Sequence, residues 1–243
     1  MKQGPRIPPK ASALLKQIGR LARERGQRAY AVGGCVRDWV LGIADGSDLD
    51  VAVEGDGIAL AGAVGESMAG EVETYPSFGT ASVQWKRGRP RVDFAGCRKE
   101  RYARPGAYPS VSPGSLQDDL IRRDFTINAM ALSLDPDAFG SMIDPFNGRR
   151  DIRLKCLRML HADSFRDDPS RILRGVRFAE RFGFHWERET LRALLQAMGE
   201  GALGWLNAGR VAKELNLMMT KEPHPAACLR HLERLMRKQE SIK

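Results

Sequence analysis

The sequence predicts an α+β fold, and three observations support that prediction. Helical and extended patterns alternate through residues 12–69, and three short strand-like segments then follow one another up to residue 95. From residue 151 onward the strand-like pattern fades, and apolar residues recur at helical spacing. The turn-rich stretch DPFNGRRDI, at 144–152, separates these regions. We therefore expect a sheet domain at 1–150 and a helical region at 151–243.

The first region supplies the expected sheet and the helices that cover it. Residues 12–25 place leucine and isoleucine at helical spacing, and Gly26 is suited to end that helix. A second helix is expected at 58–69, and the segment 97–115, rich in proline, glycine and charge, is expected to be a loop. The expected strands lie just before Gly33, at a segment that opens with Asp48 and Asp50, and at 71–75, 80–85 and 91–95.

The second region reads as successive helices. In FRDDPSRILRGVRFAERFG, Asp168 is a natural N-cap, Pro169 fits the first helical position and Gly183 lies near the end. Further helices are expected at 187–198, 207–220 and 225–238.

Composition narrows the class of protein. The chain has 243 residues, of which 42% are apolar and 28% charged, which is ordinary for a folded protein and excludes a disordered one. Its net charge of +9 favours a polyanion such as RNA as partner, although a cationic surface also serves solubility. The four cysteines have no zinc-site spacing and are expected to be reduced thiols. No apolar run is long enough to cross a bilayer, so we expect a cytosolic enzyme.

Asp48 and Asp50 are the first candidate functional residues. They alternate with Leu49 and Val51, so both acids are expected on one face at the start of a strand. Two carboxylates aimed at one point suggest Mg²⁺, whereas the alternative is a pair of solvated acids at a strand end. Asp93, which also alternates with apolar neighbours, is either a third acid near the metal or an ordinary strand-edge residue.

Two further groups of residues suggest a nucleotide. Gly33 and Gly34 lie between a strand and a helix, where bare backbone N–H groups can hold phosphate with help from Arg37. The alternative there is an ordinary tight turn with surface charges. On the helix after Asp168, arginines occupy one side and apolar residues the other, which fits either a pocket wall or a solvated face. The arginines of this stripe are Arg171, Arg174, Arg177 and Arg181.

Five segments occur in the order typical of one enzyme family. GGCVRDWVLG, DLDVAVEG, RRDFTINAMAL, DPFNGRRDI and DDPSRILRGVRFAERFGF resemble the successive motifs of the bacterial-type tRNA nucleotidyltransferase and poly(A) polymerase family, over residues 30–184. The resemblance implies a polymerase-β-like nucleotidyltransferase head with a mixed sheet, an all-helical neck and a partial body. The family usually continues beyond the segments GRVAKELNLMMT and PHPAACLRHLERLMR, so a truncated or minimal form is expected.

The resemblance also implies roles for single residues. Asp48 and Asp50 match the catalytic acids that bind Mg²⁺, and Gly34 and Arg37 match phosphate contacts. Arg123 matches a nucleotide-binding position, with Asp124 beside it. The positions that match the neck residues contacting the base and phosphates are Asp168, Arg171, Arg174 and Arg177. The chain departs from the family at Asp167, where glutamate is common. The Arg98–Glu100–Tyr102 segment resembles the family's flexible loop that helps to switch nucleotide choice.

The expected function is Mg²⁺-dependent transfer of a nucleotide from ATP or CTP to the 3′ end of tRNA. The addition would comprise CCA, CC or A alone, without a nucleic-acid template. A poly(A) polymerase acting on general RNA is the alternative within the family. A catalytically silent RNA-binding module and a small-molecule nucleotidyltransferase are the alternatives outside it. The sequence does not fix the oligomeric state.

Overall fold

The computed structural model describes residues 4–43, 48–86 and 89–241. The chain divides into two compact units. The first comprises Met1–Lys99, Val111–Arg123 and Ile127–Arg149, and the second comprises Glu100–Ser110, Asp124–Thr126 and Arg150–Lys243. The chain therefore passes between the units several times, and two short segments that precede residue 127 belong to the second unit.

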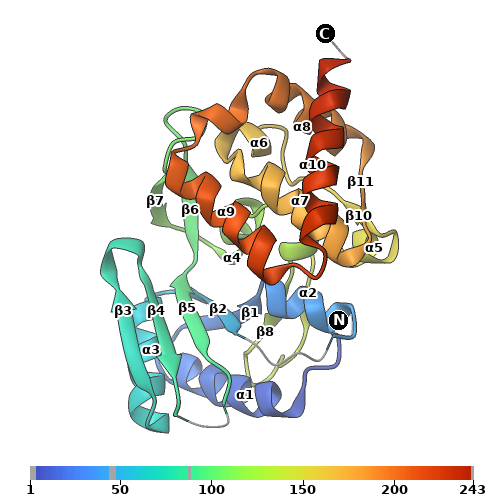
Figure 1. The fold of residues 1–243 in the computed structure, drawn as a ribbon. Helices are drawn as coiled ribbons and strands as arrows, with labels where there is room; N and C mark the ends of the chain where they lie inside the picture. Colours follow the sequence, from blue (N-terminus) through green and yellow to red (C-terminus); the bar gives the residue numbers. More distant parts are fainter. Residues whose placement is uncertain (1–3, 44–47, 87–88, 242–243) are drawn as a thin grey trace. The chain divides into compact units, whose positions relative to one another are not determined.

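A seven-stranded mixed sheet forms the centre of the first unit (Figure 1). It confirms the mixed sheet that the family resemblance implied, although its last two strands, β8 and β9, were not predicted. Its strand order is β3-β4-β5-β2-β1-β8-β9, in which β2 and β5 are parallel and the other neighbours antiparallel. The strands are β1 (Arg28–Val32), β2 (Leu49–Glu54), β3 (Glu71–Tyr75), β4 (Thr80–Gln84), β5 (Val92–Gly96), β8 (Ala131–Ser133) and β9 (Met142–Ile143).

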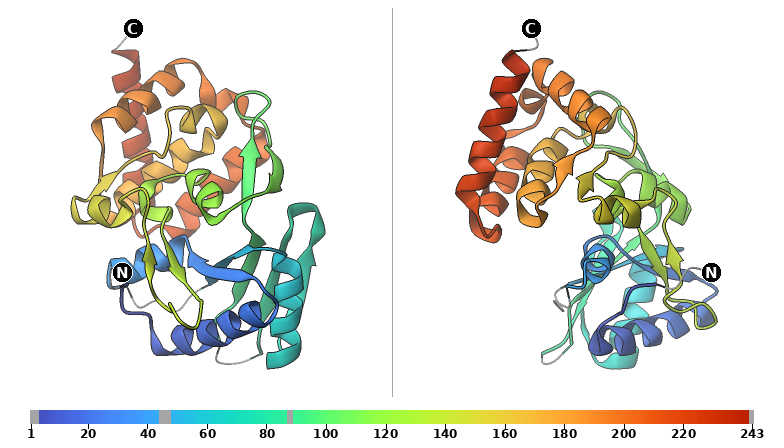
Figure 2. Two further views of the ribbon diagram at one scale, coloured as in Figure 1. Left: turned by 180° about the vertical axis from the view of Figure 1, so that it is seen from behind. Right: turned by 90° about the vertical axis from the view of Figure 1, so that its right-hand side faces the viewer.

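Helices α1 (Pro9–Glu24) and α3 (Gly57–Met68) pack together along the sheet, where they can be followed in both views of Figure 2. Each buries an apolar stripe, represented by Leu15 in α1 and Val64 in α3, which have no solvent exposure. The first unit also contains two short helices, α2 (Gly34–Val40) and α4 (Leu116–Ile121), and the 3₁₀ turn η1 (Pro76–Phe78). A second 3₁₀ turn, η2 (Thr126–Asn128), begins in the second unit and ends in the first.

The segment 97–115 was wrongly predicted to be a loop throughout. It forms a two-stranded ribbon from β6 (Arg98–Arg101) and β7 (Ser110–Pro113). The prediction failed because most residues of both strands are charged or small, so neither shows the alternation of apolar residues that marks a half-buried strand. Pro105, Gly106 and Pro109, which suggested a loop, lie between the strands, whereas Pro113 ends β7 and Gly114 follows it.

The second unit contains the four helices that the sequence predicted. They are α7 (Ser170–Phe182), α8 (Arg188–Gly199), α9 (Ala208–Lys221) and α10 (Pro225–Glu240). It also contains α6 (Ser164–Asp167) and the 3₁₀ turn η3 (Ala202–Trp205), which were not predicted, and α5 (Gly148–Arg153) enters from the first unit. Helix α7 begins one residue later than predicted, with Pro169 at the N-cap. A parallel pair of very short strands, β10 (Cys156–Leu157) and β11 (His185–Trp186), was not predicted.

Aromatic rings form much of the core of the second unit. Phe125 packs against Phe165, Phe178 and Trp186, with ring centroids 6.1 to 6.4 Å apart. Gly175 of α7 permits this packing, because a Cβ there would lie 2.2 Å from the Trp186 ring. The short segment Asp124–Thr126 is thereby fixed within the second unit.

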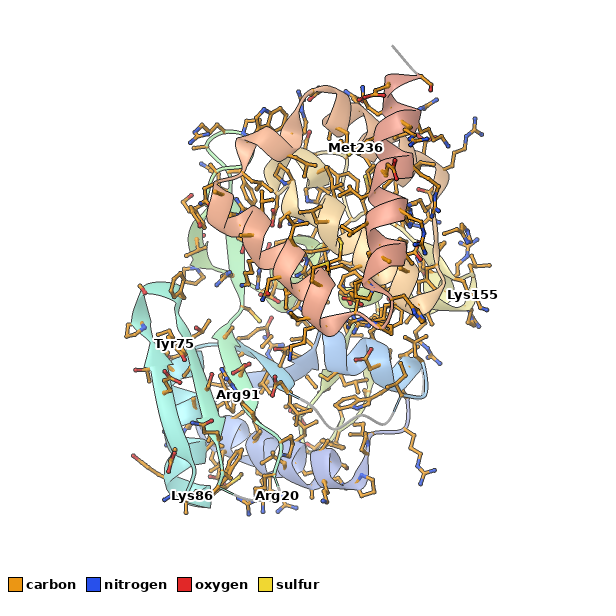
Figure 3. The ribbon with its side chains drawn as sticks, in the orientation of Figure 1. Arg20, Tyr75, Lys86, Arg91, Lys155 and Met236 are labelled. Atoms are coloured by element: carbon orange, nitrogen blue, oxygen red, sulfur yellow. The ribbon has the colours of Figure 1, made fainter. Side chains whose placement is uncertain are left out.

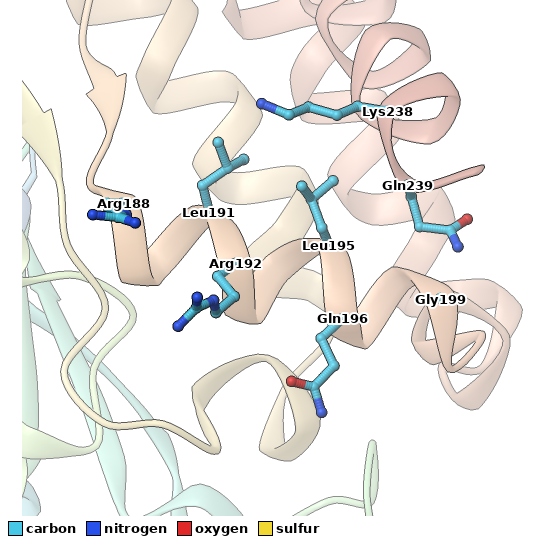
Figure 4. A pocket seen from close by; sticks show the side chains of 8 residues that line it. All are labelled: Arg188, Leu191, Arg192, Leu195, Gln196, Gly199, Lys238 and Gln239. Atoms are coloured by element: carbon cyan, nitrogen blue, oxygen red, sulfur yellow. The ribbon is translucent and has the colours of Figure 1, made fainter. Parts of the chain in front are cut away.

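A cavity of about 650 Å³ lies between α8 and α10 in the second unit (Figure 4). Leu191 and Leu195 form its apolar floor, and the positively charged side chains of Arg188, Arg192 and Lys238 also line it. None of the site residues predicted from the sequence lines this cavity. In the part of the chain that the structure describes, no helix is long and apolar enough to span a membrane.

Buried ion pairs join α7 to α9 and to the residue that follows α9. Arg177 donates from Nε to Glu222 Oε1 at 2.8 Å and from Nη1 to Glu214 Oε2 at 2.6 Å. Arg181 binds the same Glu222 carboxylate with two N–H groups, each at 2.7 Å. Arg177, Glu214 and Glu222 are each only 5 to 6% exposed. The arginine stripe of α7 is therefore not a solvated face.

Replacing Arg177 by alanine is expected to destabilise the second unit. The Glu214 and Glu222 carboxylates would stay buried with their best partner removed, a change that costs roughly 3–5 kcal/mol when a buried pair is broken. The matched control is Arg192→Ala, because Arg192 pairs with Glu189 on the surface at 3.2 Å. That pair contributes about 1 kcal/mol or less. Urea denaturation followed by circular dichroism compares the two, and equal midpoints would contradict the role given to Arg177.

Candidate active site

The turn after β1 brings backbone close to two charged side chains. Gly33 has φ 73° and ψ −131°, a conformation that favours glycine. A Cβ at Gly33 would lie 2.8 Å from Arg123 Nη1 and 3.4 Å from Asp50 Oδ2. The positive φ therefore favours glycine at this position, and a side chain there would also displace the end of the Arg123 guanidinium. Gly34, the next residue, begins α2.

Asp50 lies in the middle of the sheet, where three strands meet. It pairs with Val32 on β1 and with Asp93 on β5. Leu49, Val51 and Val53 are buried, so alternation along β2 places Asp50 on the opposite face from these apolar residues. There it borders a cavity of about 400 Å³.

The surroundings of Asp50 disfavour its charge. Although solvent reaches the side chain, burial raises the pKa of the Asp50 carboxyl to about 6, and the carboxylates of Asp93 and Asp48 act in the same direction. Arg123 and Arg37 oppose the shift without cancelling it. The exposed Asp48 immediately precedes β2 and is close enough to influence Asp50 electrostatically, as the spacing of the two acids suggested. Residues 44–47, which lead into this strand, lie outside the described chain.

Asp93 lies opposite Asp50 but has its own partners. Its Oδ1 accepts a hydrogen bond from Ser82 Oγ at 2.5 Å and from Arg91 Nε at 2.9 Å. Arg91 and Tyr75, labelled in Figure 3, line the same cavity. Among the described residues, no three His, Cys, Asp or Glu side chains are gathered closely enough to hold a metal alone.

Arginines supply the positive charge of this cavity. Arg123 donates from Nη2 to Asp119 Oδ2 at 2.7 Å, and Arg122 binds the other oxygen of the same carboxylate. Burial alone would raise the pKa of Asp119, but Arg123 and Arg122 lower it below its ordinary value. Arg123 Nε is buried and has no hydrogen-bond partner among the described residues. An unsatisfied buried N–H of this kind is a donor available to an anion.

Arg37 is more deeply fixed than the sequence suggested. It is 5% exposed and donates from Nη1 to Asn128 Oδ1 at 2.8 Å and from Nε to Asp38 Oδ1 at 2.8 Å. Sequence reasoning did not identify Asn128 or Asp119 as site residues. The signal for Asn128 was available, since it is a buried polar residue within the apolar segment FTINAMALSL.

The second unit holds the other predicted residues. Arg174 donates from Nε and Nη2 to Asp124 Oδ2, at 2.9 and 2.7 Å, and this carboxylate raises the pKa of Arg174 further above its ordinary value. Arg171 is buried and donates to Ser164 Oγ at 2.7 Å. Asp124 is thus a direct partner of the arginine stripe.

Asp168 has a capping role and also lines a cavity. Its Oδ1 accepts from the Ser170 backbone N–H at 3.0 Å, close to the N-cap role expected from the sequence. The same side chain lines a cavity of about 440 Å³ together with Arg174, Arg210 and Tyr108. Arg171 and Arg177 do not line this cavity.

Comparisons with known proteins identify the family of this chain. Residues 29–158 match the poly(A) polymerase head domain family. An A-adding tRNA nucleotidyltransferase of Aquifex aeolicus (strain VF5) is 47% identical over 195 residues, which are 80% of this chain and 23% of that protein. A CC-adding tRNA nucleotidyltransferase of Deinococcus radiodurans is 36% identical over 231 residues, covering 93% of this chain and 59% of that protein.

Solved structures give the same result. A crystal structure of a tRNA nucleotidyltransferase complexed with a primer tRNA and an incoming ATP analog superposes with a TM-score of 0.80 at 41% identity, over 92% of this chain and 61% of that one. The chain therefore spans less than two thirds of each of these three proteins. The family match covers more than half of the chain and includes both acids, Gly33 and Arg123, so the resemblance in the sequence is confirmed. This chain belongs to the poly(A) polymerase head domain family.

Proposed function

We propose that this protein is a template-independent RNA nucleotidyltransferase that adds C, A or both to the 3′ end of tRNA and releases pyrophosphate. The observation that carries the proposal is the cavity in the first unit, where an acid with a raised pKa lies beside an arginine with an unsatisfied donor. The names of the relatives, A-adding and CC-adding tRNA nucleotidyltransferases, support the choice of tRNA. They leave open which of the two nucleotides is added.

The acids of the first unit fit a magnesium ion. Asp48 and Asp50 would hold Mg²⁺, whose chemistry is to lower the pKa of an attacking hydroxyl and to neutralise charge on phosphate oxygens. Mg²⁺ in nucleotide enzymes is usually held by one or two carboxylates plus substrate phosphates, so two acids suffice without a protein cage. A cation would also offset the unfavourable charge of Asp50. Asp93 is engaged by Arg91 and Ser82, so its role as a third ligand remains a proposal.

The other residues of the first unit would bind and orient the triphosphate. Arg123 Nε offers a buried N–H to a phosphate oxygen, and Asp119 holds the guanidinium in position. Gly33 and Gly34 allow phosphate to approach the backbone. Arg37 lies near Gly34, 3.7 Å from where a Cβ would be, and would add positive charge from a position fixed by Asn128.

Residues of the second unit would select the base. Adenine and cytosine carry an exocyclic amine at the position where uracil and guanine carry a carbonyl. The Asp168 carboxylate accepts hydrogen bonds only, so it favours that amine over the uracil carbonyl, whereas guanine still offers N1–H and N2–H donors and has to be excluded by another contact. Arg174, in the same cavity, supplies a cation toward phosphate or base, while Arg171 and Arg177 would support the pocket from behind. The net charge of +9 would attract the RNA backbone, with an affinity that falls as salt rises.

Incorporation assays separate the proposed activity from its alternative, a poly(A) polymerase. Purified protein receives tRNAs lacking A, CA or CCA, or an unrelated RNA, together with Mg²⁺ and one labelled nucleotide at a time. We expect incorporation on tRNA only, ending after one to three additions. Long A tails on every RNA would instead identify a poly(A) polymerase. Absence of any incorporation would favour a silent RNA-binding module.

Asp50→Asn is expected to abolish incorporation and to raise thermal stability. The loss should exceed roughly 1,000-fold, because several kcal/mol of charge stabilisation would be removed. Burial raises the pKa of Asp50 from its ordinary value of 3.8 to about 6, so its ionisation costs stability above pH 6 and costs nothing below pH 4. In metal-free buffer at pH 8 the melting temperature should rise by about 1–3 °C. This is less than the pKa shift of Asp50 alone would give, because solvent reaches the side chain and screens its charge.

Asp137→Asn is the matched control for that experiment. Asp137 is exposed and pairs with Arg23, which lowers the pKa of its carboxyl. Its replacement should leave incorporation near the native rate and should not raise the melting temperature. An active Asp50→Asn protein would remove the proposed metal site.

A further inference from the structure

The two oxygens of the Asp168 carboxylate differ in the number of hydrogen bonds that they accept. Its Oδ1 accepts three hydrogen bonds, from the Ser170 N–H at 3.0 Å, from Ser170 Oγ at 2.5 Å and from Arg210 Nη2 at 2.5 Å. Among the described residues no donor is hydrogen-bonded to Oδ2. Asp168 therefore has essentially one acceptor atom, Oδ2, available to a ligand in the cavity that it lines.

Arg210 is itself held by three other contacts within the second unit. Its Nη1 donates to the Gly106 carbonyl at 2.8 Å, and its guanidinium carbon lies 5.4 Å from the centre of the Tyr108 ring. Its backbone N–H is bound by the side chain of Asn207, which also donates to the Tyr108 hydroxyl at 3.2 Å. Gly106 has φ 70°, and a Cβ there would lie 2.8 Å from Trp205, so this tip of the β6–β7 ribbon packs closely.

We propose that Arg210 determines base specificity by occupying Oδ1 of Asp168, and that Tyr108 holds Arg210 in that position. The inference rests on the proposed function, since it assumes that Asp168 reads the base. A carboxylate with both oxygens free matches guanine well, because the N1–H and N2–H groups of guanine are two parallel donors. A carboxylate with one oxygen occupied can accept only one hydrogen bond from the base. That suffices for the single amine of adenine or cytosine but not for the two donors of guanine. Arg210 thus works chiefly by excluding guanine.

The contributions of Arg210 and Tyr108 differ in kind. Arg210 contacts Asp168 directly, whereas Tyr108 acts only through Arg210 and is a positioning residue. An arginine side chain has many rotamers, and a ring beneath its guanidinium restricts them. Tyr108 is 72% exposed, so its place is not explained by burial. Losing Tyr108 should therefore weaken selectivity less than losing Arg210.

The test is equilibrium binding of ATP, CTP, GTP and UTP to the full chain with Mg²⁺, together with kcat and KM on tRNA. For Arg210→Gln we expect the GTP:ATP affinity ratio to rise at least tenfold, and for Tyr108→Ala about 2- to 5-fold. Tyr108→Phe, which keeps the ring, should stay near the native ratio. The matched control is Lys213→Gln, which removes a charge from the same helix and cavity. It should weaken all four nucleotides alike and leave the ratio unchanged.

Each outcome has a definite meaning. If Arg210→Gln keeps the GTP:ATP affinity ratio of the native protein, the inference is overturned. The proposed function would still stand in that case, provided that the native protein binds nucleotide. A changed ratio in Arg210→Gln with a native one in Tyr108→Ala would overturn the role of Tyr108. An equal change in Lys213→Gln would assign the effect to charge alone and overturn the specific role of Arg210. A native protein that binds no nucleotide would refute the proposed function itself. If Arg210→Gln fails to fold, Arg210→Met takes its place, because methionine keeps an unbranched side chain but has no donor for Asp168. A native GTP:ATP ratio in that variant would overturn the inference.

Discussion

The unfavourable charge of Asp50 is the constraint around which the first unit is arranged. Three strands place this carboxylate at the centre of a sheet, with other acids before it and across from it. A chain optimised only for stability would have no reason to place acids together here. Instead, the cost is partly offset by Arg123, which in turn depends on a glycine at position 33 and on the buried Asp119. The glycine turn, the arginine and the acid form one electrostatic unit.

Arginine has two distinct uses in this chain. Arg177 and Arg37 are buried with well-placed acceptors, so they hold helices and loops in position. Arg123 and Arg210 each line a cavity, Arg123 with one donor left without a partner and Arg210 with its guanidinium bound to Asp168 and to the Gly106 carbonyl. Planar guanidinium groups serve both uses well because they offer five donors in a fixed geometry. The fold thus uses some of these donors for its own stability and leaves others for a ligand.

Much of the fold could be predicted from the sequence because its signals are local. Periodicity identified the strands around Asp50 and the helices of the second unit, and turn residues identified their ends. The ribbon at 97–115 was missed because its strands carry no apolar alternation. Helix α7 was misplaced by one residue because an aspartate before a proline can cap from either of two positions.

The candidate site was predictable only in part, for a physical reason. Acids and glycines carry their chemistry in short motifs, so Asp48, Asp50 and Gly33 could be recognised. The partners that set their behaviour are far away in the sequence, as Asn128 is from Arg37 and Arg210 from Asp168. Contacts of that kind depend on tertiary packing and leave no local pattern. The buried carboxylates of Glu214 and Glu222 could not be assigned to Arg177 for the same reason.

The repeated passage of the chain between the two compact units has a consequence for how such a protein can be taken apart or recombined. Residues 100–110 and 124–126 belong to the second unit, yet each is joined at both ends to the first. A single proteolytic cut near residue 149 would leave those two segments covalently attached to the wrong fragment. Exchange of the second unit between related proteins by one crossover would bring in α9 without the Tyr108 and Gly106 that hold Arg210. Interchangeable modules therefore have to be defined here by spatial contact, because neither unit is one uninterrupted stretch of sequence.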